Sequence, residues 1–254
     1  MENVSGYMID MDGTVYRGNE VIPGAPEFIE RLKAKKIPFV FLTNNSAWSR
    51  VHYFNKLTKM GFRISIENIL TSTTATVTFL KKHRKGRTVY PLGTASFVKE
   101  ITHSGIRINE DDPDIVLLAF DTSITYEKMN NAYQFLIKGK ELIATHPDDL
   151  CPTENGYDID IGPFIRFFES MTGKKATVIG KPNPLMVKMA AETMDVSPDG
   201  MVMVGDRIYT DMRMAADSGI RSILVLTGEA KMSDLDGSGI IPTETVNSVD
   251  EILR

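Results

Sequence analysis

The sequence predicts a doubly wound parallel α/β sheet with a large α/β unit inserted into it, and two observations favour this fold class. Short apolar runs, typical of strands that are buried on both faces, alternate with segments whose apolar residues repeat at helical spacing. Acidic, hydroxyl and lysine side chains follow directly after several of these runs, where open α/β sheets bind ligands. The 254 residues, 42% of them hydrophobic, suffice for one large core or two smaller ones.

The amino-terminal segment predicts a strand, a helix and a second strand. A mostly apolar run leads into Asp10, and a continuous apolar run ends at Thr43. Between them, the segment 23–36 has Pro26 where the first turn of a helix tolerates proline. Its apolar residues fall on one helical face: Ala25, Phe28, Ile29 and Leu32. The order strand, helix, strand is the unit from which parallel sheets are built.

The carboxy-terminal third repeats this alternation, and we assign all of its strands to the same sheet. Strands are expected at 177–180, 200–206 and 221–228. Helices are expected from about Pro184 to Met194 and in a short segment ending near Gly219.

The insertion lies late in the chain, because 137 residues separate Thr43 from Lys181. Its first part predicts a helix over 48–60, which Gly61 ends and which completes the core. The part from about 84 to 175 predicts a second α/β unit with strands at 114–120 and 141–146. Between these two strands lies a helix whose apolar residues share one face: Met129, Ala132, Tyr133 and Leu136. Another helix begins at Phe164 and ends near Gly173. We therefore expect a core of 1–83 and 176–254 and an inserted domain of 84–175.

Charge and cysteine content exclude several classes of protein. A net charge of -4 and a pI near 5.7 give no electrostatic footprint for nucleic acid or an anionic membrane. The single cysteine, Cys151, excludes an internal disulfide, and no apolar run has the length of a membrane span. The first residues lack the features of a signal peptide, so the expected location is the cytoplasm.

Six polar residues lie at or just after the ends of four predicted strands. The first strand is followed by Asp10 and Asp12, and the others by the hydroxyl of Thr43, by Lys181 and by two further acids, Asp206 and Asp211. Carboxylates bind hard Mg²⁺, whereas lysine, hydroxyl and backbone N–H groups bind phosphate oxygens. A cation would screen the repulsion among these acids and an incoming phosphate dianion.

Each of these signals is weak by itself. An isolated aspartate pair in a turn is about as often solvated as catalytic. Thr43 at a strand end is typical of turn chemistry, and Lys181 only precedes a helix in the simplest interpretation. Asp211 lies where a helix begins, so a role as helix cap is as well supported as a catalytic one. The combination, after several buried strands, favours a shared site.

Four segments, in this order, resemble the motifs of the haloacid dehalogenase-like superfamily: "DMDGT", "FLTNN", "GKPNP" and "GDRIYTD". The resemblance spans the chain, and "DMDGTVYRGNEVIPGA" together with "GKPNP" is most similar to the NagD-type, 4-nitrophenylphosphatase-like branch. It implies a Rossmann-like core with a large α/β cap. It also implies that Asp10 is the nucleophile and Asp12 the general acid and base.

The same resemblance implies the remaining ligands. Thr43, the backbone near Asn44, and Lys181 would hold the phosphate. Magnesium would be held by Asp10, Asp206 and the backbone carbonyl of Asp12, with Asp211 supporting the metal or the lysine. In the cap, His146 and Asp160 are expected to contact the leaving group, although this sequence departs there from its relatives.

The expected function is hydrolysis of small phosphomonoesters through an aspartyl-phosphate, with 4-nitrophenyl phosphate also accepted. Nucleoside monophosphates, sugar phosphates, pyridoxal phosphate and 2-phosphoglycolate are candidate substrates. Two alternatives stay open: a phosphotransferase or phosphomutase, and a non-catalytic module that accepts or binds phosphate. The expected partner is a small phosphorylated metabolite, not nucleic acid or membrane. Whether the protein forms a homodimer is left open by the sequence.

Overall fold

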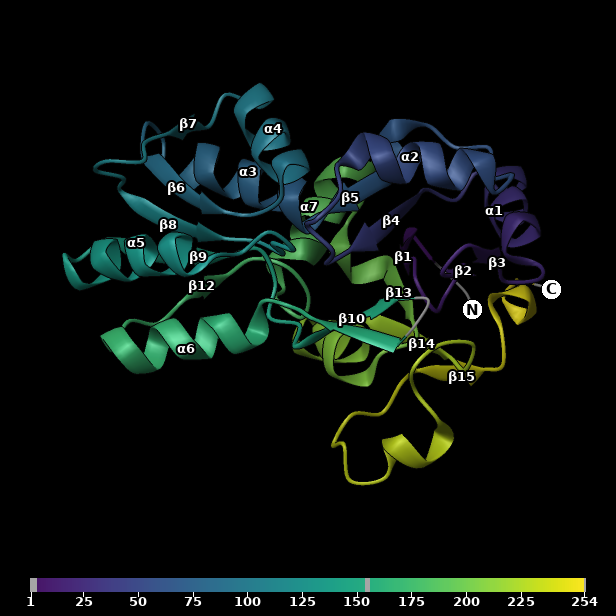
Figure 1. The fold of residues 1–254 in the computed structure, drawn as a ribbon. Helices are drawn as coiled ribbons and strands as arrows, with labels where there is room; N and C mark the ends of the chain where they lie inside the picture. The colour runs from purple at the N-terminus through teal and green to yellow at the C-terminus, as the bar shows by residue number, and fades with distance from the viewer. Residues whose placement is uncertain (1–3, 154–155, 254) are drawn as a thin grey trace. The chain divides into compact units, whose positions relative to one another are not determined.

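The computed structural model describes residues 4–153 and 156–253, which form two compact units (Figure 1). The core unit contains the residues up to Thr43, Val51–Leu70 and the chain from Lys181 onward. The inserted unit contains Asn44–Arg50 and Thr71–Gly180. This division differs from the expected one, because residues 44–50, 71–83 and 176–180 lie in the inserted unit.

The core unit is built on a six-stranded sheet of strand order β15-β14-β13-β1-β4-β5. Its strands are, in chain order, β1 Gly6–Asp10, β4 Phe39–Thr43, β5 Ile69–Thr71, β13 Met201–Gly205, β14 Arg221–Val225 and β15 Glu244–Val246. Strand β1 pairs in parallel with both β4 and β13, and β13 continues in parallel to β14 and β15. Because the chain leaves the centre in both directions, the sheet is doubly wound, and the predicted fold class is confirmed.

Helices of the core unit bury the faces that their sequences indicate. They are α1 Ala25–Ala34, α2 Arg50–Lys59, α7 Leu185–Met194, α8 Arg213–Asp217 and a π-helical turn at Ile208–Met212. The predicted apolar face of α1 is buried, with Phe28 and Leu32 fully inaccessible to solvent. A small ribbon follows β1, formed by β2 Tyr16–Arg17 and β3 Glu20–Val21. Among its described residues, this unit also has short 3₁₀ turns at Ile66–Asn68, Pro198–Gly200, Met232–Leu235 and Val249–Glu251.

The inserted unit has its own parallel sheet, of strand order β12-β9-β8-β6-β7. Its strands are β6 Thr88–Leu92, β7 Arg107–Ile108, β8 Ile115–Leu118, β9 Glu141–Ala144 and β12 Thr177–Val178. Its helices are α3 Ser72–His83, α4 Ala95–His103, α5 Tyr126–Ile137 and α6 Gly162–Thr172. Side-chain hydroxyls of threonine cap the first turns of α3, α4 and α5, which fixes where these helices begin.

The strand predicted at 177–180 belongs to the inserted unit, so its assignment to the core sheet was wrong. Strand β12 pairs with β9, aligning Thr177 with Ile143 and Val178 with Ala144. A short apolar run shows that a strand forms but not which sheet it joins, and here the pairing partner decides. The chain enters the core unit immediately afterwards, at Lys181.

The segment after β9, for which the sequence predicts no strand, contains an antiparallel ribbon. Its strands are β10 Leu150–Thr153 and β11 Gly156–Ile159, with Leu150 opposite Ile159. Among the helices that the described residues form, none is long and apolar enough to cross a bilayer.

Candidate active site

Three side chains from distant parts of the sequence meet at one end of the core sheet. Asp10 is the last residue of β1, Lys181 opens the return of the chain to the core, and Asp211 lies in the π-helical turn after β13. Nζ of Lys181 contacts Oδ1 of Asp10 and lies 2.7 Å from Oδ1 of Asp211. All three residues are buried, so the lysine bridges two carboxylates away from bulk water.

Asp206 joins this group from the end of β13. Carboxylate oxygens of Asp10, Asp206 and Asp211 lie within 4.8 Å of one another. Oδ2 of Asp206 accepts a hydrogen bond from the backbone N–H of Glu229 at 2.7 Å. Its other oxygen, Oδ1, is buried and has no hydrogen-bond partner among the residues that the structure describes. An unsatisfied buried carboxylate oxygen is costly and therefore indicates a missing ligand.

Close glycines make room for the Asp206 carboxylate. A Cβ atom on Gly228 would lie 1.9 Å from Oδ2 of Asp206, and one on Gly13 would lie 2.3 Å from the same oxygen. Gly13 also has φ of 84°, a conformation that other residues rarely adopt. Any side chain at either position would displace the carboxylate from its place beside Asp10.

The electrostatics of the group are unbalanced without a further cation. Burial, together with the charges of Asp10 and Asp211, raises the pKa of Asp206 to about 8. Burial likewise raises the pKa of Asp211 to about 6, against the opposing charge of Lys181. Burial disfavours the charge of Lys181, but Asp10 and Asp211 outweigh it and raise the pKa of the lysine. The charge of Arg207 lowers the pKa of both aspartates, but its guanidinium pairs with Glu229, and the three carboxylates still outnumber the buried Lys181.

These observations fit a divalent metal ion. The group offers hard carboxylate oxygens within the spacing that one ion can bridge, and the buried Oδ1 of Asp206 is an available donor. A metal ion would supply the positive charge that the three carboxylates lack. The acidic cluster could therefore hold such an ion.

Asp12 and Thr43 flank this group. Asp12 follows Asp10 by two residues and forms a bridge with Tyr16 in the turn after β1. Burial, followed by the neighbouring charge of Asp10, raises the pKa of Asp12. Thr43 ends β4, one position beyond Leu42, which is the register partner of Asp10. Neighbouring parallel strands therefore present the Thr43 hydroxyl and the Asp10 carboxylate at the same edge.

Asp211 does not cap a helix. The π-helical turn starts after Arg207, and Asp211 lies inside it with its side chain fully buried. Its Oδ2 accepts the backbone N–H of Arg207 at 3.2 Å, while its Oδ1 accepts Nζ of Lys181. The carboxylate thus ties the turn after β13 to the lysine, and the capping interpretation is not supported.

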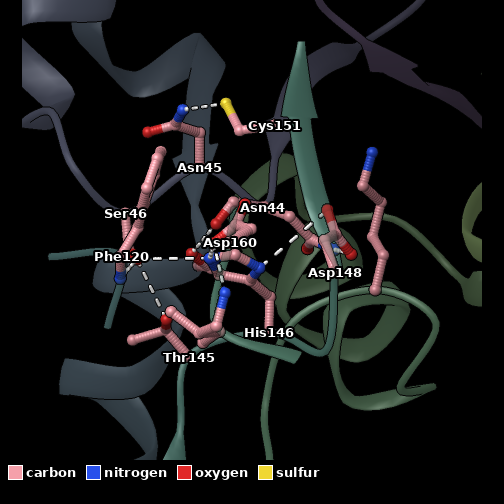
Figure 2. A network of polar contacts seen from close by, with 12 residues as sticks. Asn44, Asn45, Ser46, Phe120, Thr145, His146, Asp148, Cys151 and Asp160 are labelled. Atoms are coloured by element: carbon pink, nitrogen blue, oxygen red, sulfur yellow. Dashed lines mark hydrogen bonds and ion pairs between the residues drawn. The ribbon is translucent and has the colours of Figure 1, made fainter. Parts of the chain in front are cut away.

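The remaining predicted residues lie in the inserted unit (Figure 2). Nδ2 of Asn44 donates to Oδ1 of Asp148 at 2.9 Å. His146 is fully buried, with Nε2 3.3 Å from Oγ of Ser46 and 3.6 Å from Oδ1 of Asp160. Asp160 also accepts the backbone N–H of Ile161 at 2.8 Å. Their predicted contacts with phosphate and leaving group stay predictions.

Sequence reasoning missed several participants. The close approach of Gly13 and Gly228 to Asp206 has no signature beyond the glycines themselves, and Gly228 lies 22 residues after that aspartate. Asp148 was not singled out as a partner of Asn44, because the two residues are 104 positions apart. Only the packing of the inserted unit brings that pair together.

Comparison with known proteins agrees with this arrangement. A family model for haloacid dehalogenase-like hydrolases matches residues 7–107, and a second, HAD-hydrolase-like model matches residues 178–252. The chain is 32% identical over 255 residues to an acid sugar phosphatase of Staphylococcus saprophyticus, covering 100% of this chain and 98% of the relative.

Two solved structures have the same fold throughout. The 4-nitrophenylphosphatase of Thermotoga maritima superposes with a TM-score of 0.94 at 39% identity, covering 98% of this chain and 96% of that one. NagD of Escherichia coli K-12 superposes with a TM-score of 0.91 at 29% identity, covering 98% of each chain. The similarity therefore includes the inserted unit as well as the core.

Proposed function

Because this chain belongs to the haloacid dehalogenase-like hydrolases, in the NagD-type branch of phosphatases, we propose that it hydrolyses small phosphomonoesters with Mg²⁺ and through an aspartyl-phosphate. The observation that carries the proposal is the buried group of Asp10, Lys181, Asp206 and Asp211. A carboxylate nucleophile, a fixed cation and two further acids are the components that such a reaction needs.

In the first step, a carboxylate oxygen of Asp10 attacks the phosphorus atom, and the bond from phosphorus to the ester oxygen breaks. Phosphomonoester hydrolysis is among the slowest uncatalysed reactions, and an acyl phosphate divides it into two easier steps. Lys181 and the Thr43 hydroxyl are proposed to bind the phosphoryl oxygens, joined by backbone N–H groups near Asn44. Lys181 also holds Asp10 in position through their contact.

Asp12 is proposed to protonate the departing ester oxygen and then to take a proton from the water that attacks the phosphoryl group. This second step releases inorganic phosphate and regenerates Asp10. A general acid must carry a proton when the leaving group departs, and the raised pKa of Asp12 favours that form.

We propose that Mg²⁺ is held by Asp10, Asp206 and the backbone carbonyl of Asp12. Asp211 would hold Lys181 in position through their hydrogen bond. When bound, the ion would neutralise charge on the phosphoryl oxygens. Asp206 fits this role through its free buried oxygen, whereas both oxygens of Asp211 already accept hydrogen bonds.

Sugar phosphates are the substrates that we favour, because the Staphylococcus saprophyticus relative is named an acid sugar phosphatase. We propose that the inserted unit acts as a cap that selects the leaving group, with His146 and Asp160 as contacts. A cytoplasmic location and a homodimer stay predictions from the sequence.

The test is an assay of the purified protein on 4-nitrophenyl phosphate and a panel of sugar phosphates, with Mg²⁺ or EDTA. Wild-type protein should hydrolyse these esters in Mg²⁺ and lose this activity in EDTA. Asp10→Asn should abolish turnover on every ester, since an amide cannot form the acyl phosphate. Borohydride reduction of quenched wild-type enzyme should convert the phosphorylated Asp10 to homoserine, and Asp10→Asn should give none. Full activity in EDTA, or near-normal rates for Asp10→Asn, would refute the proposal.

The variant Asp12→Asn tests the proposed acid and base role of Asp12 separately from the nucleophilic role of Asp10. Loss of a general acid costs about 10²- to 10⁴-fold in rate. The loss should be greater for sugar phosphates, whose alkoxide leaving groups need a proton, than for 4-nitrophenyl phosphate. An equal loss on both ester classes would argue against Asp12 as the acid. Phosphate transfer from one sugar position to another during the same assay would favour the phosphomutase alternative.

A further inference from the structure

We propose that Asp148 is a positioning residue for phosphate binding, because it holds the segment Asn44–Ser46 that directly follows Thr43. The inference rests on the proposed function, in which Thr43 and the backbone after it bind the phosphoryl group. Asp148 would act through Asn44 and would not itself touch the substrate.

Three consecutive side chains of this segment are anchored in the inserted unit (Figure 2). Asn44 donates from Nδ2 to Oδ1 of Asp148 at 2.9 Å, and Nδ2 of Asn45 donates to Sγ of Cys151 at 3.3 Å. Ser46 accepts the backbone N–H of Phe120 through Oγ at 2.9 Å.

Of these anchors, the one from Asp148 is charged and buried. Asn44 is 5% and Asp148 7% exposed, so their hydrogen bond is shielded from water. A hydrogen bond to a buried charged group is stronger than one between neutral groups, and losing either partner leaves the other unsatisfied. Asp148 is also tied to the first residue of α6, since its backbone carbonyl accepts the N–H of Gly162 at 2.8 Å. The acceptor therefore has little freedom to follow Asn44 if the segment moves.

The chain connects this anchor directly to the phosphate site. The two units divide between Thr43 and Asn44, and adjacent Cα atoms are about 3.8 Å apart in any trans peptide. Thr43 is held on its other side by β4, whose residue Leu42 pairs with Asp10. Losing the side-chain bond of Asn44 would remove one restraint on the peptide after Thr43 and leave the hydrogen bond from the Ser72 hydroxyl to the Asn44 carbonyl. The N–H groups of that peptide segment and the Thr43 hydroxyl are the proposed phosphate donors. Misplacement of such donors by about 1 Å costs on the order of 10²-fold.

The experiment compares Asp148→Ala with Asp149→Ala in the full-length enzyme. Asp149 is the neighbouring residue, but its side chain is 56% exposed and pairs with the exposed Arg166. We expect Asp148→Ala to raise KM and the inhibition constant of inorganic phosphate about tenfold. The factor should be the same for 4-nitrophenyl phosphate and for sugar phosphates, because only the phosphate is shared. Asp149→Ala should change each constant less than twofold.

Exchanging donor and acceptor tests the contact itself. Asn44→Asp alone sets two carboxylates against each other and should weaken phosphate inhibition at least as much as Asp148→Ala. Combining Asn44→Asp with Asp148→Asn restores one donor and one acceptor and should recover most of the loss. The backbone N–H of residue 44 is the same in all of these variants, so any change arises from the side-chain contact. Hydrogen exchange at 44–46 should rise in Asp148→Ala and return towards wild type in the double variant.

Each outcome of these experiments either supports or overturns the inference about Asp148. Wild-type protein inactive on every ester would remove the proposed function and this inference with it. An active wild type with an unaltered phosphate inhibition constant in Asp148→Ala would overturn this inference alone. A loss confined to sugar phosphates would also overturn it, since Asp148 would then act on the leaving group. If Asp148→Ala does not fold, failure of the double variant to improve on Asn44→Asp would overturn the inference in its place.

Discussion

Nζ of Lys181 lies 2.7 Å from Oδ1 of Asp211, and the same nitrogen contacts the carboxylate of Asp10. Lys181 reaches this position immediately after the chain leaves the inserted unit, so the lysine marks the point where the core resumes. Its ammonium group is buried between two buried acids. Both the stability of the core unit and the proposed catalysis should therefore depend on Lys181.

Lys181→Met should destabilise the protein by about 3 kcal/mol, because removing one partner of a buried ion pair leaves its charges uncompensated. Urea denaturation of the purified variants measures this change. Lys175→Met is the matched control, since Lys175 is 85% exposed and pairs with Glu169 at the surface, where such pairs contribute about 0–1 kcal/mol. Equal effects of the two substitutions would show that Lys181 is not held as a buried charge.

The convergence of the core residues could be predicted, because parallel strands that alternate with helices end at one edge of a sheet. Asp10, Thr43 and Asp206 each end or directly follow a buried strand, and their sequence signals are local. The partnership of Asn44 with Asp148 could not be predicted, because it depends on how β9 and the following turn pack in the inserted unit. Sequence spacing carries no information about such a contact.

Strand and helix assignments failed where tertiary context decides. The run at β12 has strand propensity, but its pairing with β9 and not with the core is a long-range choice. Helix α3 begins with a run of serine and threonine, which favours caps and strands over helices. The capping box of Thr71 and Thr74 nevertheless starts it. The ribbon of β10 and β11 was missed although Tyr157, Asp158 and Ile159 alternate between apolar and polar residues. The run is short, and all four residues of β11 are exposed, so no buried face supports it.

Metal binding should stabilise the protein through Asp206. A ligand that binds only the folded state at 100 times its Kd contributes about 2.7 kcal/mol, which for a chain of this size corresponds to roughly 5–10 °C in Tm. Thermal denaturation with Mg²⁺ or EDTA should show this rise in wild type and not in Asp206→Asn. Without metal, Asp206→Asn should melt at or above wild type, because the amide removes a carboxylate that burial disfavours.

Asp158→Asn is the control for the metal, since Asp158 lies on the exposed strand β11. It should keep the full Mg²⁺-dependent rise in Tm. A rise of wild-type size in Asp206→Asn would exclude Asp206 as a metal ligand. A rise in none of the proteins would argue against Mg²⁺ itself.

Asp114 should make the inserted unit sensitive to acid. The backbone N–H of Thr88 and the guanidinium of Arg87, both 2.8 Å from its carboxylate, lower its pKa to about 2. Because the folded pKa lies below the unfolded value near 3.8, this contribution to stability is complete above about pH 4 and is lost as the pH falls towards 2. Asp114→Asn should lower Tm at pH 7 by a few degrees, and the difference from wild type should disappear near pH 2.

The control for this pH dependence is Asp111→Asn, at an exposed position of the same unit. Its Tm should follow wild type within about 1 °C at both pH values, as expected for surface substitutions. A difference between Asp114→Asn and wild type that stays constant from pH 7 to 2 would show that the ion pair and its hydrogen bonds are not the cause.

Substitution of His146 tests whether the buried network of the inserted unit also contacts the leaving group. Its imidazole lies between Ser46 and Asp160, and both it and Asp160 are almost fully buried. A hydrogen bond from either residue to a sugar hydroxyl would be lost in His146→Ala or Asp160→Ala. The expected cost is about 1–3 kcal/mol in kcat/KM for the preferred sugar phosphate. Hydrolysis of 4-nitrophenyl phosphate should change little, because that ester offers few polar groups for such a contact. This pattern differs from the one expected for Asp148→Ala, which should affect both esters equally. If His146→Ala and Asp160→Ala also lower both activities by the same factor, these two residues only support the segment Asn44–Ser46, and their predicted contact with the leaving group is wrong.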